Sequence, residues 1–317
     1  MSKVRVLFCS DVHGSDKLFL KFVNAGPIYG AKVLVIGGDI AGKEVIPIFE
    51  RDGGYVAQVQ GSVRTAKSKE DLEALMKDIR FLGIYPYVTT DADWAVSARD
   101  EKKMAEVFDV LISESLGRWC AIAEERLKPK GIRVIINNGN DDPPVVGETI
   151  AKSGFVELPN DKVVELDGQH EMLSLGYSNP TPWDLPGDIS EEALTEKIER
   201  LVSSVKLMDC CSFNIHVPPI ETHLDIAPLL NPDLSPRLTA GGEPEMGHVG
   251  SVAVRKGIEK YQPLLGLHGH VHESKGYSKI GKTHCFNPGS EISVGILKGV
   301  LLDLSDNKLA NYAFTAG

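Results

Sequence analysis

The sequence has little that would place the protein in a membrane or outside the cell. Its N-terminal apolar stretch is interrupted by Lys3 and Arg5, and it is too short for a signal peptide or for a membrane span. The five cysteines form no Cys-x-x-Cys pair, and the neighbours Cys210 and Cys211 are poorly placed for a disulfide. These absences predict a cytoplasmic protein with buried free thiols and no membrane partner.

Positive charge is also scarce. The chain has 34 lysines and arginines against 44 aspartates and glutamates, a formal net charge of −10, and no stretch concentrates the cations. Binding to nucleic acid backbones depends on clustered cations, so a nonspecific DNA- or RNA-binding protein is disfavoured. Any bound cation would add local positive charge that this count omits.

Three short apolar runs predict buried strands, in a chain that is 42% hydrophobic and 25% charged, as globular proteins are. Each run leads into a cluster of polar residues and glycines: residues 4–9 into 10–14, residues 32–36 into 37–39, and residues 132–136 into 137–142. Ligands bind at the carboxyl edge of open α/β sheets, so these clusters are candidates for one site.

Helical periodicity lies mainly between the second and third of these strands. A capping pattern at Ser68 begins an amphipathic stretch to about residue 82, and a longer apolar stripe runs through 104–127. Because strands on both sides carry parts of one expected site, we predict a single domain over 1–317 with a helical insertion at about 41–128.

The second half of the chain is predicted to mix strands and helices. In chain order we expect a hairpin of 163–166 and 172–175, a helix over 194–205, a strand over 211–215, a long loop at about 217–247, a helix near 249–260, a strand over 263–267 and closing strands over 293–303 and 309–314. The long loop fits either a cover over the site or an excursion into solvent.

Seven side chains are candidates for metal binding: Asp11, His13, Asp39, Asn140, His216, His270 and His272. Asp-x-His and His-x-His place both side chains on one side of an extended segment, so each pair can reach a common ion. Taken singly, the Asp and Asn residues also fit turns, and a lone histidine fits a hydrogen-bonded core position. Their joint occurrence at the ends of apolar runs favours a metal site.

In order and type, these residues resemble the motifs of the calcineurin-like metallophosphoesterase superfamily. That family carries Asp-x-His, Gly-Asp, Gly-Asn-His/Asp, a single His and Gly-His-x-His; here they are residues 11–13, 38–39, 139–141, 216 and 269–272. Residues 286–291, Phe-Asn-Pro-Gly-Ser-Glu, also resemble small bacterial and archaeal phosphodiesterases of the superfamily. The resemblance implies an α/β fold, a four-layer αββα sandwich of two packed mixed β-sheets flanked by helices.

The same resemblance divides the seven side chains between two metal ions with one ligand shared: Asp11, His13 and His272; Asn140, His216 and His270; and the bridging Asp39. Two divalent cations about 3.5–4 Å apart can clamp the attacking and leaving oxygens of a displacement and activate a water molecule. The mixed ligands suit manganese, our first expectation, with iron, zinc, nickel or cobalt as alternatives, better than calcium.

The third motif departs from the commonest form of the family. Asp141 stands where a histidine usually protonates the leaving group or steadies the phosphate, and Asn140 and Asp141 are the implied catalytic residues. A carboxyl near two cations stays ionised, so we expect Asp141 to orient a water or a histidine, and good leaving groups to be favoured. The second motif also lacks the arginine of the protein Ser/Thr phosphatases, and Lys43 is expected to be a solvated surface residue.

The expected reaction is hydrolysis of a small-molecule phosphate ester, a phosphodiester before others, by a water or hydroxide bridging two metals. No suitably placed serine or cysteine nucleophile accompanies the ligands, so no covalent intermediate is expected. The alternatives are a phosphomonoesterase or nucleotide pyrophosphatase with the same site, a nuclease, which the acidic balance disfavours, and a non-catalytic scaffold of the same fold.

Overall fold

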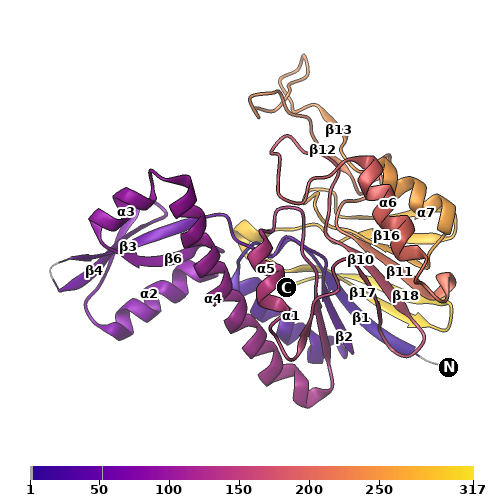
Figure 1. Ribbon diagram of the computed structural model, residues 1–317, viewed down its shortest axis with the longest axis horizontal. Helices are drawn as coiled ribbons and strands as arrows, with labels where there is room; N and C mark the ends of the chain where they lie inside the picture. The colour runs from indigo at the N-terminus through magenta and orange to yellow at the C-terminus, as the bar shows by residue number, and fades with distance from the viewer. Residues whose placement is uncertain (1–2, 52) are drawn as a thin grey trace.

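Two six-stranded mixed β-sheets form the body of the protein (Figure 1). The computed structural model describes residues 3–51 and 53–317. The first sheet has the order β18-β17-β1-β2-β7-β8, with bounds β1 Lys3–Cys9, β2 Val33–Ile36, β7 Arg133–Ile136, β8 Val156–Glu157, β17 Lys298–Ser305 and β18 Lys308–Ala316. The second has the order β15-β16-β14-β11-β10-β9, with bounds β9 Lys162–Glu165, β10 Glu171–Leu175, β11 Cys211–Ile215, β14 Leu265–Leu267, β15 Gly276–Ile280 and β16 Thr283–Asn287.

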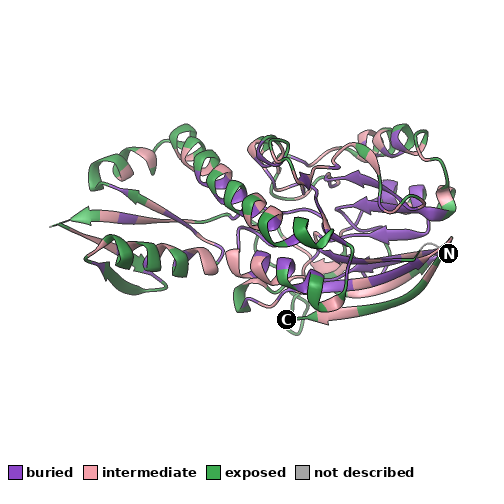
Figure 2. Ribbon diagram, turned by 90° about the horizontal axis from the view of Figure 1, so that it is seen from below, coloured by how far each residue is buried: buried purple, intermediate pink, exposed green. Residues whose placement is uncertain are grey.

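Successive side chains of a strand point to opposite faces of its sheet, so each sheet has apolar residues on both faces. Val6 and Phe8 of β1 pack between the sheets against Leu265 and Phe286, whereas Leu7 belongs to the core on the opposite face. Helices α1 Asp16–Tyr29, α4 Glu101–Leu127 and α5 Pro144–Ile150 cover the first sheet, and α6 Glu191–Val202 and α7 Val252–Tyr261 cover the second. The predicted αββα sandwich is confirmed, and Figure 2 shows its buried strands enclosed by partly exposed helices.

The segment between β2 and β7 differs from the expected helical insertion. It contains α2 Lys69–Phe81, α3 Asp91–Ser97 and α4, but also a four-stranded sheet of order β5-β4-β3-β6, with bounds β3 Val45–Arg51, β4 Gly54–Val59, β5 Ser62–Ala66 and β6 Tyr85–Thr89. These strands are short and half exposed, so they carry no long apolar run in the sequence. Together with α2 they enclose a small core of their own.

The two helices predicted within this insertion form where expected. Ser68 caps α2, and Asp71 returns the hydrogen bond to complete the capping box. Helix α4 ends at Leu127, just before the short 3₁₀ helix η1 Lys128–Lys130. Trp119 of α4 stacks on Phe19 of α1 with ring centroids 4.4 Å apart, so α4 is docked firmly on the sandwich.

The long loop of the second half contains a short ribbon, β12 Ile226–Pro228 and β13 Met246–His248, which projects from the body (Figure 1). The 3₁₀ helix η2 Met208–Cys210 precedes β11. The first closing strand begins later than predicted, because the 3₁₀ helix η3 Ile292–Val294 and the left-handed Gly295 occupy the positions before it. No helix within the described part of the chain has the length and apolarity to cross a membrane.

Candidate metal centre

The candidate ligands lie at neighbouring strand ends. In the first sheet β1, β2 and β7 run parallel, and Asp11, Asp39 and Asn140 follow their carboxyl ends. In the second sheet β11 and β14 run parallel, and His216 and His270 follow them. Because the sheets pack against each other, their carboxyl edges bring together side chains far apart in the sequence, such as His13 and His272, which are 259 residues apart.

Asp11, His13, Asp39 and His272 form one group that could hold a metal ion. Their ligand atoms all lie within 4.8 Å of one another. The Nε2 atoms of His13 and His272 lie 3.2 Å apart. Oδ1 of Asp11 is 3.5 Å from Nε2 of His272, and Oδ2 of Asp39 is 3.8 Å from Nε2 of His13. Two imidazole nitrogens and two carboxylate oxygens therefore face a common point.

A second group consists of Asp39, His216 and His270, again within 4.8 Å of one another. Oδ1 of Asp39 lies 3.2 Å from Nε2 of His216. Oδ1 of Asn140 lies 3.0 Å from Nδ1 of His270, which adds the amide to this group. Asp39 thus faces the first group with Oδ2 and the second with Oδ1. Among the described residues, Asp39 is the only one that belongs to both groups, although Oδ1 of Asp11 also lies 3.7 Å from Nε2 of His216.

A buried ring nitrogen without a hydrogen bond indicates that this site is shaped for a cation. Within the described chain, Nε2 of His216, which faces Oδ1 of Asp39, is buried and makes no hydrogen bond of good geometry. A native core rarely leaves such atoms without a partner unless a ligand completes the site. Imidazole, carboxylate and amide groups are also the ligand set that transition metals prefer, so the residues present fit a divalent cation.

The electrostatics give two of the four candidate histidines the neutral form that a metal ligand needs. Burial lowers the pKa of His13, and burial together with His216 lowers that of His270 to about 4, so both imidazoles are neutral. Burial opposes ionisation of Asp39, but His216 outweighs it and holds the pKa of Asp39 well below its usual range. Burial also lowers the pKa of His216, yet Asp39 and Asp11 raise it to about 9, so a cation bound beside these carboxylates would displace the proton of His216.

The backbone at the site is strained in a way that the surrounding structure must maintain. Asp11, His13, Asp39 and His270 have positive φ angles of 58°, 37°, 53° and 67°. Residues with a side chain seldom adopt this region, and such outliers gather at functional sites. The strand ends and their hydrogen bonds therefore hold four candidate ligands in conformations that a free loop would avoid.

Glycines allow the loops of the site to touch. A Cβ atom on Gly139 would lie 1.9 Å from Oδ1 of Asp39, and one on Gly269 would lie 2.4 Å from Oδ2 of Asp11. A real Cβ cannot approach so closely, so each motif glycine provides the space in which the neighbouring carboxylate sits.

Two further aspartates support the centre and were missed in the sequence. Asp188 accepts a hydrogen bond from Nδ2 of Asn140 at 2.8 Å, which turns the amide oxygen toward His270. Asp142 accepts backbone hydrogen bonds from Ile40, Ala41 and Gly139, at 2.7–3.0 Å, and so ties the second motif to the third. Asp142 belongs to the cluster 137–142, whose Asn and Asp residues also fit a turn, whereas no motif singled out Asp188.

Residues 286–291 brace the last pair of histidines. Nδ2 of Asn287 donates to the carbonyl oxygens of Gly269 and Val271, at 3.2 and 2.9 Å. Oγ of Ser290 donates to the carbonyl oxygen of Asp11 at 2.8 Å. These bonds connect the first and the last motif through a segment that itself supplies no candidate ligand.

Asp141 lies beside the centre and pairs with Lys43. Its backbone N–H donates to Oδ1 of Asp39 at 3.3 Å, and its carboxylate forms an ion pair with Lys43. Burial and the nearby Asp39 raise the pKa of Asp141. The expectation that Lys43 is merely solvated is wrong in part, because its exposed ammonium group has a partner at the edge of the site.

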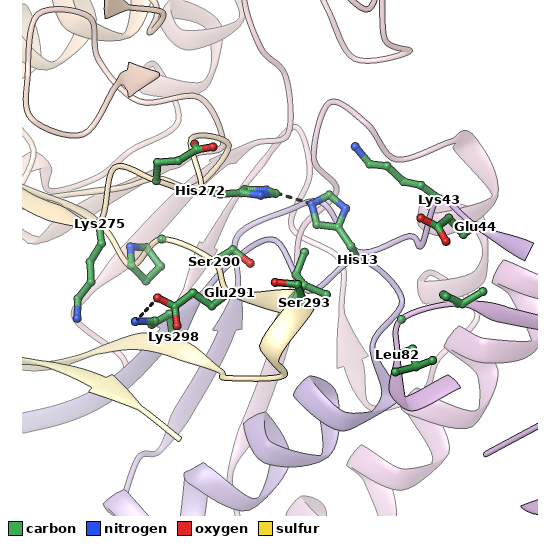
Figure 3. Close-up of a pocket in the computed structure, with 16 residues that line it drawn as sticks. His13, Lys43, Glu44, Leu82, His272, Lys275, Ser290, Glu291, Ser293 and Lys298 are labelled. Carbon is green, nitrogen blue, oxygen red and sulfur yellow. Dashed lines mark hydrogen bonds and ion pairs between the residues drawn. The ribbon is translucent and has the colours of Figure 1, made fainter. Parts of the chain in front are cut away.

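A pocket of about 730 Å³ opens beside His13 and His272. Figure 3 shows these two rings at its centre, with Lys43 and Leu82 on one side and Lys275 and Lys298 on the other. The projecting ribbon contributes none of the described residues that line it, so the long loop does not cover this pocket. The pocket gives a ligand direct access to the first group of side chains.

Comparisons of the sequence with known proteins give one partial match. No protein-family model matches the sequence. The uncharacterized protein MJ1162 of Methanocaldococcus jannaschii is 31% identical over 143 residues, which are 44% of this chain and 58% of that protein. The match therefore spans little more than half of the length of this relative.

Among solved structures, TT1561 of Thermus thermophilus matches over 100% of this chain and 99% of its own, with 14% identity and a TM-score of 0.56. At this identity the likeness shows the fold alone. An archaeal phosphodiesterase is matched over 99% of both chains, with 10% identity and a TM-score of 0.36, too low to bear on the activity. The architecture is the sandwich of two mixed sheets that the motifs implied.

Proposed function

We propose that this chain, built on the metallophosphoesterase fold, is a hydrolase of phosphate esters that uses two divalent metal ions, manganese first among them. The observation that carries the proposal is the carboxylate of Asp39, which faces two groups of buried ligands with its two oxygens. Asp11, His13 and His272 would hold one ion, and Asn140, His216 and His270 the other.

Bound divalent cations would neutralise charge on the phosphoryl oxygens and lower the pKa of a water molecule. The chain's own residues prepare the site for them. Burial keeps His13 and His270 neutral, Asp188 orients Asn140, and the strained loops fix the ligands before substrate arrives. The pocket then admits the ester group beside His13 and His272.

A phosphodiester is the preferred substrate because of the motifs shared with small phosphodiesterases, and a phosphomonoesterase or nucleotide pyrophosphatase is the runner-up. The test begins with protein stripped of metal and reloaded with manganese, zinc, nickel or magnesium. Elemental analysis should find about two ions per chain. Hydrolysis of bis-p-nitrophenyl phosphate should exceed that of p-nitrophenyl phosphate.

Each contrary outcome removes a different part of this proposal. Faster hydrolysis of the monoester would replace the diester by the runner-up. Two bound ions without turnover of any ester would make the protein a scaffold. A chain that takes up no ion would contradict the metal centre itself.

Asp141→Ala is expected to lower kcat about tenfold for a diester with a poor leaving group, such as an alkyl alcohol, and less for p-nitrophenyl esters. The side chain would orient a water or a histidine next to Asp39, and a good leaving group needs less of that help. Steady-state kinetics on a matched series of diesters provide the measurement.

Lys43→Gln tests whether Asp141 acts directly, by orienting a water or a histidine, or indirectly, by holding Lys43 at the pocket. If Asp141 acts by holding Lys43 at the pocket, Lys43→Gln should reproduce the loss, and the double variant should add little to it. Asp233→Asn, an exposed aspartate of the long loop that bonds Ser235, is the matched control and should leave the kinetics unchanged. Equal rates for wild type and Asp141→Ala with every leaving group would refute the role.

A further inference from the structure

The insertion reaches the pocket beside the metal centre. Its turn between α2 and β6, made of Leu82, Gly83 and Ile84, lines the same pocket as His13 and His272. Figure 3 shows Leu82 on the opposite side of the pocket from Lys275 and Lys298, with Glu291 and Ser293 between them and the two histidine rings above. The turn therefore stands beside the place where the ester group of a bound phosphate ester would lie.

A seam of glycines fixes this turn against the first motif. A Cβ atom on Gly14 would meet Gly42 at 2.8 Å, one on Gly42 would meet the carbonyl oxygen of Gly83 at 2.7 Å, and one on Gly83 would meet that of His13 at 3.0 Å. Positive φ angles of 71° at Gly14 and 83° at Gly83 exclude side chains as well. The turn is thus in backbone contact with the loop that carries His13.

Polar contacts around the seam make it rigid. The hydroxyl of Tyr85 accepts a hydrogen bond from the backbone N–H of Gly42 at 2.9 Å. Asp16, at the start of α1, accepts from Nε1 of Trp119 at 2.6 Å and pairs with Arg80 of α2 at 3.3 Å. Both ends of the insertion are therefore tied to the residues that follow His13, which holds the turn in a constant position relative to the centre.

The part of the pocket surface that the turn forms together with Ile292 is apolar. Leu82 is 36% exposed, and Ile84 and Ile292 are half-buried beside it. The lysines of the pocket already have partners: Lys43 pairs with Asp141, and Lys298 pairs with Glu291 at 2.9 Å.

The remaining charges at the pocket are two carboxylates and one lysine, a balance that does not favour a second anion. Glu44 and Glu273 line it as exposed carboxylates, and Lys275 lies over the ring of Phe314 at 5.1 Å. A substrate with further phosphates would bring its charge near these carboxylates. An uncharged ester group would instead bury the exposed part of Leu82 and gain from contact with Ile84.

We propose that the turn 82–84 of the insertion is a specificity-determining wall, and that the substrate is a phosphodiester whose ester group is uncharged and apolar. The inference rests on the proposed function, because it takes the phosphoryl group to lie at the metal centre. It gives the insertion a part in substrate choice and disfavours a nucleotide pyrophosphatase.

Binding of phosphonates tests the wall without any turnover. Calorimetry on the manganese-loaded protein would compare phenylphosphonate, which carries a large apolar group, with methylphosphonate, whose apolar group is far smaller. Leu82→Ala should weaken phenylphosphonate about fivefold, and Ile84→Val about twofold, while methylphosphonate changes little. Val63→Ala, 71% exposed on β5 of the same insertion and outside the pocket, is the matched control.

Kinetics provide a second readout. For bis-p-nitrophenyl phosphate, Leu82→Ala should raise KM about fivefold with little change in kcat, whereas methyl p-nitrophenyl phosphate should respond less. The specificity role of the turn would be overturned if Leu82→Ala weakened binding of the two phosphonates equally, or if it weakened binding of neither. Tighter binding of a nucleoside diphosphate than of phenylphosphonate would overturn the substrate class. If the loaded wild type binds neither phosphonate, the metal centre does not receive a phosphoryl group, and the proposed function fails instead.

Discussion

Asp39→Asn should reduce phosphodiester hydrolysis by about a thousandfold and reduce the bound metal from about two ions per chain to one or fewer. Asparagine keeps the shape of the side chain but has one oxygen in place of two. In the wild type, Oδ1 faces His216 and Oδ2 faces His13, so an amide can serve only one of the two groups. Elemental analysis and steady-state kinetics on the same preparation would measure both effects.

A loss of metal distinguishes this result from simple misfolding. The wild type should melt at a lower temperature after treatment with a chelator, because ions that bind only the folded state stabilise it. Asp39→Asn should have lost most of this difference. Asp233→Asn again provides a control with the same chemical change at an exposed site. Full metal content in Asp39→Asn would show that the carboxylate is not the shared ligand.

Gly139→Ala should lower activity about a hundredfold and destabilise the fold by about 1–3 kcal/mol. The added methyl group would lie 1.9 Å from Oδ1 of Asp39 and 2.3 Å from its backbone nitrogen, so the loop of the second motif must shift. Displacement of a shared ligand by even a fraction of an ångström misplaces both groups of the centre. Chemical denaturation and kinetics would measure the two effects.

Gly154→Ala is the matched control for this substitution. Gly154 is exposed, and a Cβ atom there would meet nothing within 4 Å. It should leave both activity and stability nearly unchanged, since the same methyl group enters open space. Normal metal content and activity in Gly139→Ala would contradict the close contact between the second and third motifs.

The strand ends and the candidate ligands could be predicted because their signals are local. Each apolar run of the sheets is followed directly by its polar motif, so residue order alone placed Asp11, Asp39 and Asn140 at one sheet edge. The histidines of the second sheet followed the same rule. That these side chains are metal ligands stays a prediction, as does the single domain, although the structure brings all seven together.

The supporting contacts could not be predicted in this way. Asp188 reaches Asn140 across 48 positions of sequence, and nothing near Asp188 marks it as part of a site. The sheet of the insertion was missed because its strands are short, half exposed and lack a continuous apolar run. Contacts of these kinds depend on how separate segments pack, which a local pattern does not record.

The two sheets contribute different halves of the centre. Asp11, His13, Asp39 and Asn140 come from the first sheet, and the remaining histidines come from the second. The distance between the halves is therefore set by the thickness of the apolar layer in which Phe8 and Phe286 are packed. The volume of the side chains between the two sheets therefore controls the distance between the two sets of candidate ligands. Substitutions that repack this layer would change that distance without altering any of the ligands.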